Sequence, residues 1–293
     1  MAISAAQVKE LRERTGLGMM ECKAALVETD GNMEAAIDVL RKKAGAKVEK
    51  KAHRVAAEGA IGLYVSEAGD AGALVEINSE TDFVAKEERF ASFAQMLAEL
   101  VVKKNPANVE ALAALPGSAG GTVADERAGL VAQFGENITI RRFVRMTADG
   151  GRLGHYVHGR KIGVLIRITG GDATLARDLA MHIAASRPQY VQPADVPADV
   201  MEREKAIYVA QAQESGKPRE IIEKMVMGKV KKYLDDISLV GQPFVKDPET
   251  TVGEQLKRGK ATAQAFHRLE VGEGIEREAS NFASEVMSQV QGS

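Results

Sequence analysis

An internal repeat constrains the fold of this chain more than any other feature. The segment Gly59–Val65, with the sequence Gly-Ala-Ile-Gly-Leu-Tyr-Val, is matched by Gly151–Val157, with Gly-Arg-Leu-Gly-His-Tyr-Val. Each copy continues with a second apolar strand and an amphipathic helix, at residues 72–77 and 85–102 in the first copy and at 163–168 and 175–186 in the second. The sequence therefore predicts a unit of strand, strand and helix that is used twice.

Such units predict an α+β core made of two related halves. An antiparallel sheet buries its alternating apolar residues by placing helices on one face. Residues 137–146 and 263–271 have the pattern of further strands, which we expect to widen the two sheets.

Residues 4–54 predict a separate helical module. Ser4 and Gln7 form a capping box for a first helix, Thr15–Gly18 ends that helix, and Asn32 caps a third helix. The apolar stripe of the middle helix is predicted to be Met20, Ala24 and Val27. Three short helices around a Gly-Leu-Gly turn are typical of a ubiquitin-associated-like bundle.

A bundle of this size buries little apolar surface, so some of its apolar side chains can remain exposed. Leu17, Met19 and Met20 either fill the core or remain available to a partner. Cys22 is expected to be a packed thiol, because no base is paired with it. The basic run 41–54 has no interleaved aromatic residues, so we interpret it as a solvated helix end and linker rather than a nucleic-acid site.

The C-terminal part predicts a helical hairpin and a final helix. One helix runs to about Gln213 and a second from Arg219 to about Leu234, with a thin apolar seam at Ile222, Met225, Val226 and Tyr233. The hairpin either self-associates or packs on its own core. A last amphipathic helix carries Ile275, Ala279, Phe282, Val286 and Val290. It either folds back or docks on a partner.

These patterns divide the chain into six expected segments. They are the N-terminal three-helix bundle with its basic linker (1–54), the first core half (55–148), the first part of the second half (149–190), the inserted antiparallel helical hairpin (191–240), the return of the second half (241–270) and the C-terminal helical module (271–293).

The corner between the strand and helix of the first copy carries an aromatic residue in an unusual place. Thr81 or Asp82 is the expected N-cap, which puts Phe83 in the first helical turn, at the rim of the layer. The ring is either a hydrophobic staple that closes the corner or, with Asp82, a wedge that enters a partner. The second copy has Asp172 but no aromatic residue at its corner, which favours the wedge.

Composition and motifs exclude several classes of function. The formal net charge of -2 gives no global electrostatic argument for nucleic acid or an anionic membrane. The single cysteine, the lack of signal-peptide blocks and the lack of long apolar runs predict a soluble, cytoplasmic protein. His155 and His158 are three residues apart on a predicted strand, so they should face opposite ways and not share a metal. No phosphate loop, dinucleotide fingerprint or nucleophile with its base is assembled, so we expect neither enzymatic chemistry nor a cofactor.

Several ordered motifs resemble bacterial elongation factor Ts over essentially the whole chain. They are the segments 11–16 (Leu-Arg-Glu-Arg-Thr-Gly), 18–26 (Gly-Met-Met-Glu-Cys-Lys-Ala-Ala-Leu), 80–85 (Glu-Thr-Asp-Phe-Val-Ala), 158–165, 241–245 (Gly-Gln-Pro-Phe-Val) and 271–276 (Val-Gly-Glu-Gly-Ile-Glu). Departures are confined to loops such as 116–122, where no effect on function is expected.

This resemblance implies a guanine nucleotide exchange factor that promotes GDP release from elongation factor Tu. It implies that Asp82 and Phe83 intrude beside the partner's magnesium site, where Phe83 shifts a partner helix and Asp82 disturbs the metal and phosphate ligands. The residues implied at this contact are Thr81, Asp82, Phe83 and Val84. The other implied partner contacts are Arg12, Leu17, Met19, Met20, Lys23 and His158.

The resemblance also implies how the partner is held. The N-terminal bundle and the C-terminal module would bind its nucleotide-binding domain, and the second core half another domain. The helical hairpin resembles a coiled-coil dimerisation element, so the resemblance allows a homodimer without requiring one. No contact with a membrane and no direct contact with nucleic acid is expected. Two alternatives remain: a ubiquitin-associated-like scaffold that leaves nucleotide release unchanged, and an RNA-binding protein that uses residues 41–54.

Overall fold

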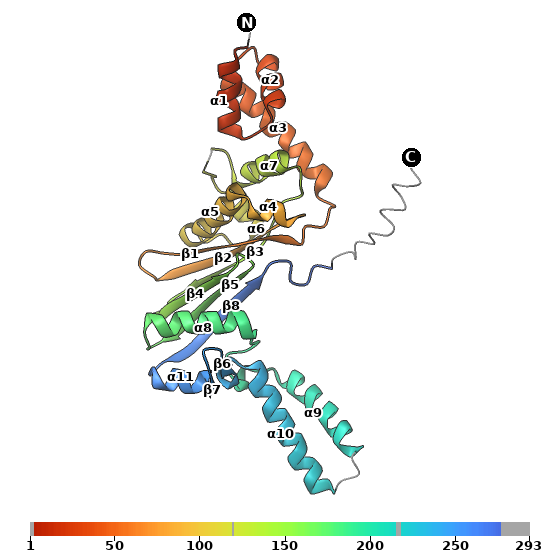
Figure 1. Ribbon diagram of the computed structural model, residues 1–293, viewed down its shortest axis with the longest axis vertical. Coiled ribbons are helices and arrows are strands. Elements are labelled where there is room, and N and C mark those ends of the chain that lie inside the picture. Colours follow the sequence, from red (N-terminus) through yellow and green to blue (C-terminus); the bar gives the residue numbers. More distant parts are fainter. Residues whose placement is uncertain (1–2, 119, 215–217, 277–293) are drawn as a thin grey trace. The chain divides into compact units, whose positions relative to one another are not determined.

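The computed structural model describes residues 3–118, 120–214 and 218–276 (Figure 1). Helices combine with three-stranded sheets in an α+β fold, as expected from the repeat. The described residues form two compact units. The first takes in residues 3–62, 75–143 and 270–276, and the second lies within 63–74 and 144–269. None of the described helices has the length and apolar character needed to cross a membrane.

The N-terminal bundle confirms the expected helix boundaries. Its helices are α1 (Ala5–Thr15), α2 (Met19–Glu28) and α3 (Met33–Lys51). Ser4 and Gln7 form the capping box, Gly16 ends α1 in the left-handed conformation with φ 73°, and Asn32 accepts from the Ala35 N–H at the start of α3. Glycine has no Cβ to oppose that φ value, so the tight turn into α2 follows from the sequence.

The predicted apolar stripe of α2 was wrong. The bundle core consists of Val8, Leu11, Leu17, Cys22, Ala25, Leu26, Ala36 and Leu40. Cys22, Ala25 and Leu26 therefore face inward, whereas Met20 is 74% exposed and Val27 58% exposed. Two apolar stripes run along α2, and the one formed by Cys22, Ala25 and Leu26 packs inside the bundle.

Residues 41–51 of the basic run form the C-terminal part of α3, and acidic residues oppose much of the charge of the run. Lys43 lies 2.6 Å from Glu28 and Lys47 lies 2.5 Å from Glu21, both on α2. These partner carboxylates come from another helix of the bundle, so the basic run alone does not reveal them.

The first sheet has the strand order β1-β2-β3, with β1 at Glu58–Val65, β2 at Ala71–Ser79 and β3 at Thr139–Thr147. β3 confirms the expected widening strand. The helices of this region are α4 (Asp82–Lys86), α5 (Glu88–Lys104), α6 (Val109–Ala113) and α7 (Val123–Phe134). The single helix expected over 85–102 is divided, because Glu87 is extended, with ψ 137°, and separates α4 from α5.

The second sheet has the order β4-β5-β8, with β4 at Arg152–His158, β5 at Ile162–Thr169 and β8 at Thr262–Glu270. β4 and β5 are antiparallel, with Tyr156 opposite Val164. Helix α8 (Ala173–Ser186) packs on these strands (Figure 1). The short elements are β6 (Pro243–Phe244), β7 (Asp247–Thr251), α11 (Val252–Arg258) and the 3-10 turns η1 (Pro193–Asp195) and η2 (Leu239–Gly241).

Equivalent glycines let each helix approach its sheet closely. A Cβ on Gly62 of β1 would lie 2.1 Å from the carbonyl oxygen of Ala94 on α5. A Cβ on Gly154 of β4 would lie 2.2 Å from the carbonyl oxygen of Ala176 on α8. These two glycines occupy the same position in the repeated sequence, so the repeat is also a repeat of packing.

The inserted hairpin consists of α9 (Ala198–Gln213) and α10 (Arg219–Ile237). Val226 is buried, and the rings of Tyr208 and Tyr233 meet edge to face at 6.5 Å between centroids. The predicted seam is thereby confirmed. Its turn at 215–217 and most of the predicted C-terminal helix, at 277–293, lie outside the described residues.

A buried histidine fixes the base of the hairpin to the second core half. The Val245 N–H donates to Nδ1 of His182 at 3.2 Å, and Nε2 lies 2.9 Å from Gln242 Oε1. Gln242 in turn donates to the carbonyl of Asp236 at the end of α10, at 2.7 Å. Burial lowers the pKa of His182, so the neutral ring, with its hydrogen on Nε2, matches these partners.

A buried carboxylate holds the chain where it leaves β8. Glu76 on β2 accepts from Arg141 at 3.0 Å, from Arg142 at 2.6 Å and from the Gly272 N–H at 2.8 Å. Burial raises the pKa of Glu76, but the Gly272 N–H and the two guanidinium groups outweigh it, so the pKa lies below its ordinary value. The ionised carboxylate therefore stabilises the first unit.

Gly62→Ala should destabilise the fold by about 3 kcal/mol, because the new methyl group overlaps the backbone of α5. Thermal unfolding followed by circular dichroism measures the loss. The matched control is Gly129→Ala in α7, where a Cβ meets nothing within 4 Å. It should leave stability unchanged or raise it by about 0.5–1 kcal/mol. Equal melting temperatures for the two variants would contradict the close approach.

Glu76→Gln should lower the free energy of unfolding by roughly 2 kcal/mol at pH 7, since it removes the charge of a fully buried carboxylate that accepts hydrogen bonds from Arg141, Arg142 and the Gly272 N–H. The pKa of Glu76 is depressed on folding, so its stabilisation is present above the ordinary value of 4.5 and is lost as pH falls through the folded value. Urea unfolding from pH 7 to pH 3 should show the two proteins converging in acid. A constant difference across this range would contradict the assignment.

Candidate partner-binding site

The corner after β2 places Phe83 in solvent. Thr81 is the N-cap of the five-residue helix α4, and Val84 and Ala85 of this helix are buried beneath it. Phe83, in the first turn, is 76% exposed. A ring that closed the corner as a hydrophobic staple would be covered, so the staple interpretation was wrong.

An acid, a ring and a base share the exposed face of α4. Asp82 lies 2.6 Å from Lys86 one turn later, and the Lys86 ammonium is 5.8 Å from the centroid of Phe83. The Lys86 side chain is largely exposed and that of Asp82 about half exposed, so their ion pair is weak and can exchange for contacts with a partner. This arrangement presents an apolar wedge flanked by a carboxylate.

The corresponding corner of the second half is built differently. Asp172 caps α8 through the Leu175 N–H at 2.7 Å, and α8 packs against the sheet from its first turn, at Ala176. In the first half the equivalent close approach comes at Ala94, in the second turn of α5. The first half therefore contains an additional helix, α4, between strand and packed helix. The sequence comparison treated the corners at Phe83 and Asp172 as equivalent, and the additional helix α4 shows that they are not.

Bonds from a distant loop brace this corner. Glu136 accepts from the Thr81 N–H at 3.0 Å and from the Thr81 hydroxyl at 2.6 Å. In return, Glu80 accepts from the Asn137 N–H at 2.6 Å. No local sequence pattern points to Glu136, because this residue follows α7, far along the chain from the corner that it contacts.

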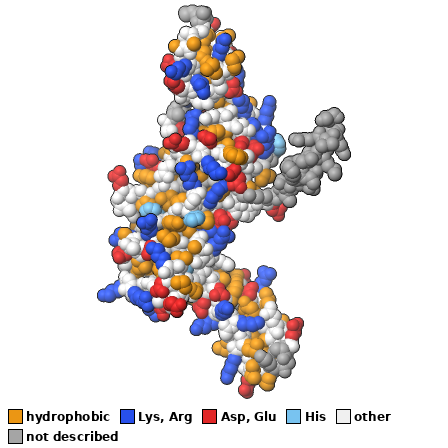
Figure 2. Space-filling model, viewed as in Figure 1, with side chains coloured by type: hydrophobic (Ala, Val, Ile, Leu, Met, Phe, Trp, Pro, Cys, Tyr) orange, Lys and Arg blue, Asp and Glu red, His pale blue; other side chains and the backbone are white. Residues whose placement is uncertain are grey.

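The second helix of the bundle presents another exposed apolar surface. Met19 is 58% exposed and lies beside Met20 on α2, and Lys23 and Arg12 are exposed as well. Figure 2 shows hydrophobic side chains on the surface of this bundle, at the upper end of the view. Methionine side chains adapt to different partners, which suits a binding surface.

Two predicted contact residues have buried side chains. Leu17 belongs to the bundle core, and Val84 lies on the buried face of α4. Any contribution that they make to a partner surface therefore comes from supporting their exposed neighbours.

His158 lies at the exposed end of β4 in the second unit. Its Nδ1 is 3.2 Å from the hydroxyl of Tyr156, which lies on the same face of the strand. His155 faces the other way, as the spacing predicted. Among the described residues, no group of three or more His, Cys, Asp or Glu side chains could hold a metal ion.

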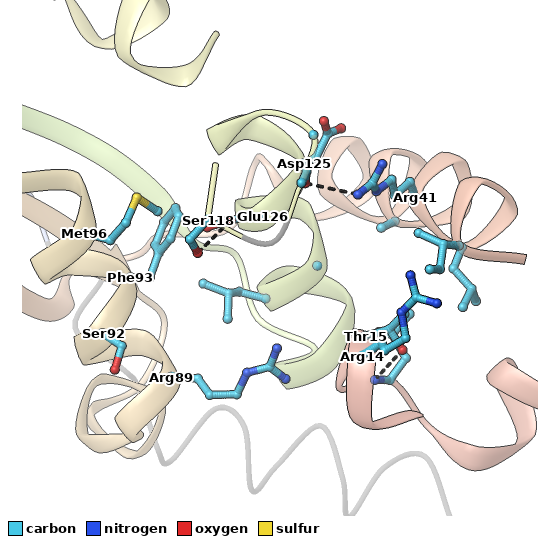
Figure 3. Close-up of a pocket in the computed structure, with 18 of the residues that line it drawn as sticks. Arg14, Thr15, Arg41, Arg89, Ser92, Phe93, Met96, Ser118, Asp125 and Glu126 are labelled. Atoms are coloured by element: carbon cyan, nitrogen blue, oxygen red, sulfur yellow. Dashed lines mark hydrogen bonds between the residues drawn. The ribbon is translucent and has the colours of Figure 1, made fainter. Parts of the chain in front are cut away.

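A cleft of about 730 Å³ lies where α1 and α3 face α5 and α7 (Figure 3). Arg14 pairs with Glu34 at 2.7 Å, and Arg41 donates to the Gly120 carbonyl at 3.0 Å. The Ser118 hydroxyl donates to Glu126 at 3.0 Å, and Ser118, Gly120 and Gly121 form part of this wall.

Comparison with known proteins identifies the family. The family model described as elongation factor TS matches residues 80–273. The chain is 56% identical to elongation factor Ts of Alkalilimnicola ehrlichii, 55% to that of Thioalkalivibrio sulfidiphilus and 54% to that of Methylococcus capsulatus, each over the whole of both chains. The chain belongs to the elongation factor Ts family.

Membership of the elongation factor Ts family places this protein in the elongation stage of protein synthesis. The family match begins at Glu80, at the start of the exposed corner. The α4 corner and the α2 face are thus two exposed surfaces of an elongation factor Ts protein.

Phe83→Ala should change the free energy of unfolding by less than about 0.5 kcal/mol, because the ring that it removes is exposed. Val84→Ala, at the next residue, should cost about 1–3 kcal/mol through the cavity it leaves. Urea unfolding of both variants makes the comparison. A loss for Phe83→Ala as large as that for Val84→Ala would restore the staple interpretation.

Proposed function

We propose that this protein is a guanine nucleotide exchange factor, that its partner is elongation factor Tu, and that it accelerates GDP release so that GTP can bind. The observation that carries the proposal is the exposed, braced Phe83 beside Asp82 in a member of the elongation factor Ts family. The proposed role is exchange without any covalent step.

The proposed mechanism uses the α4 corner against the partner's magnesium and phosphate site. GDP and magnesium are held by many charge-assisted contacts, so weakening the metal's screening of the phosphates speeds release without breaking a covalent bond. Phe83 would displace a partner helix by occupying apolar space, and Asp82 would compete for groups around the metal. Thr81 and Val84 would hold the two residues in place.

The other predicted contacts would supply binding energy away from the wedge. Met19 and Met20, with Arg12 and Lys23, offer an apolar centre with a charged rim on the bundle. His158 would contribute from the second unit. By thermodynamic linkage, if the factor lowers the partner's affinity for nucleotide, then nucleotide lowers the partner's affinity for the factor in the same ratio. Incoming nucleotide can therefore release the factor for another cycle.

Partner classes other than elongation factor Tu have less support. Lys43 and Lys47 are paired with carboxylates, so the basic run offers little free charge to an RNA backbone.

The hairpin exposes apolar side chains, among them Met227, and a homodimer through this hairpin is part of the proposal.

Release of a fluorescent GDP analogue from purified elongation factor Tu tests the proposal. Substoichiometric amounts of this protein should accelerate release with turnover. Phe83→Ala should slow the accelerated rate by at least about tenfold, since a central aromatic contact is worth ~2 kcal/mol or more. Stable binding without acceleration would instead favour the scaffold.

The matched control is Val55→Ala, which removes an exposed apolar side chain to which no partner contact is assigned; Val55 is 48% exposed, against 76% for Phe83. It should leave the accelerated rate within about twofold of the unmodified protein. An equal loss for both variants would contradict a specific role for Phe83.

A further inference from the structure

The exposed helix α4 is too short to orient its own side chains. It has five residues, and a single turn of helix is not stable in water. Its N-cap residue, Thr81, makes no side-chain capping bond. The hydroxyl is used elsewhere, in the 2.6 Å bond to Glu136. The direction in which Phe83 points must therefore be set by contacts from outside the helix.

Glu136 supplies such a contact immediately before Phe83. Its two carboxylate oxygens take the N–H and the hydroxyl of Thr81, two residues before the ring. Hydrogen bonds to an ionised carboxylate are about twice as strong as those between neutral groups. The reciprocal bond from Asn137 to Glu80 fixes the preceding residue. Two consecutive residues at the start of α4 are thus held to the loop after α7.

The same loop also receives the end of the N-terminal bundle. Lys51 at the end of α3 donates to the carbonyl of Gly135, and the side chain of Asn137 donates to the carbonyl of Arg54 at 2.7 Å. Arg54 in turn lies 3.5 Å from Glu80. The basic run, which the proposed function leaves without a role, connects the bundle to residues 135–137.

We infer that Glu136 is a positioning residue for exchange: it holds Thr81 so that Phe83 meets the partner in one fixed orientation. This inference rests on the proposed function. Glu136 itself need not touch the nucleotide, the metal or the partner. Its contribution is to remove alternative orientations of α4 before binding, which lowers the entropy lost on forming the productive complex.

The test compares Glu136→Ala with Glu254→Ala in the nucleotide-release assay. Glu254 makes the same kind of bond, accepting from the Thr251 N–H at 2.9 Å, but at the start of α11 in the second unit. Glu136→Ala should lower the exchange rate at saturating elongation factor Tu–GDP by about 10- to 100-fold, as expected when the Phe83 ring is misplaced, and should change the half-saturating concentration by less than about threefold. Glu254→Ala should leave both quantities unchanged, at a similar shift in melting temperature.

A double variant separates positioning from general stability. If Glu136 acts through Phe83, then adding Glu136→Ala to Phe83→Ala should cause no further loss of exchange. Glu136→Gln, which keeps one acceptor oxygen for Thr81, should recover part of the rate. It serves as the folded variant if Glu136→Ala fails to fold.

The outcomes distinguish this inference from the function on which it rests. If Phe83→Ala slows exchange but neither Glu136 variant does, the positioning role is overturned and the exchange function stands. Independent, multiplying losses in the double variant also overturn it. If Phe83→Ala itself exchanges normally, the proposed use of the wedge fails.

Discussion

The close approach of helix to strand in each half is the constraint on which the rest of the structure depends. The missing Cβ of Gly62 and of Gly154 brings a helix backbone directly against a strand. Where that approach falls along the helix decides how much chain must bridge the corner. In the second half it falls in the first turn of α8, so Asp172 can cap the helix at once. In the first half it falls later on α5, which leaves room for α4 and Phe83.

The Phe83 corner therefore lies where the first half departs from the packing of the second. Ordering the backbone of one residue costs about 1–2 kcal/mol of free energy on folding. Burial in α4 offsets little of this cost, since only Val84 and Ala85 of its residues are buried. Polar contacts must supply the rest of the stabilisation. The bonds from Glu136 and Asn137 do so without covering the ring, which leaves the apolar surface of Phe83 available to a partner.

Local patterns allowed much of the fold to be predicted from the sequence. The capping box at Ser4, the left-handed Gly16 and the paired strands all depend on neighbouring residues, and each is found in the structure. The inward face of α2 was mispredicted because two apolar stripes compete there. Periodicity alone cannot tell which stripe the other helices cover.

The candidate site could be predicted only in part, and the reason is physical. Phe83 could be singled out because an aromatic residue at a helix start is unusual, but its position alone left the staple and the wedge both open. Glu76 and Glu136 were not visible, because a carboxylate's role depends on donors brought to it by tertiary structure, such as the Gly272 N–H and Thr81. Both carboxylates hold backbone segments that burial leaves unfixed. A binding site made of exposed residues on a short helix must be held in place by contacts from other parts of the chain. Because local sequence patterns do not show such contacts, the residues that make them cannot be recognised from the sequence.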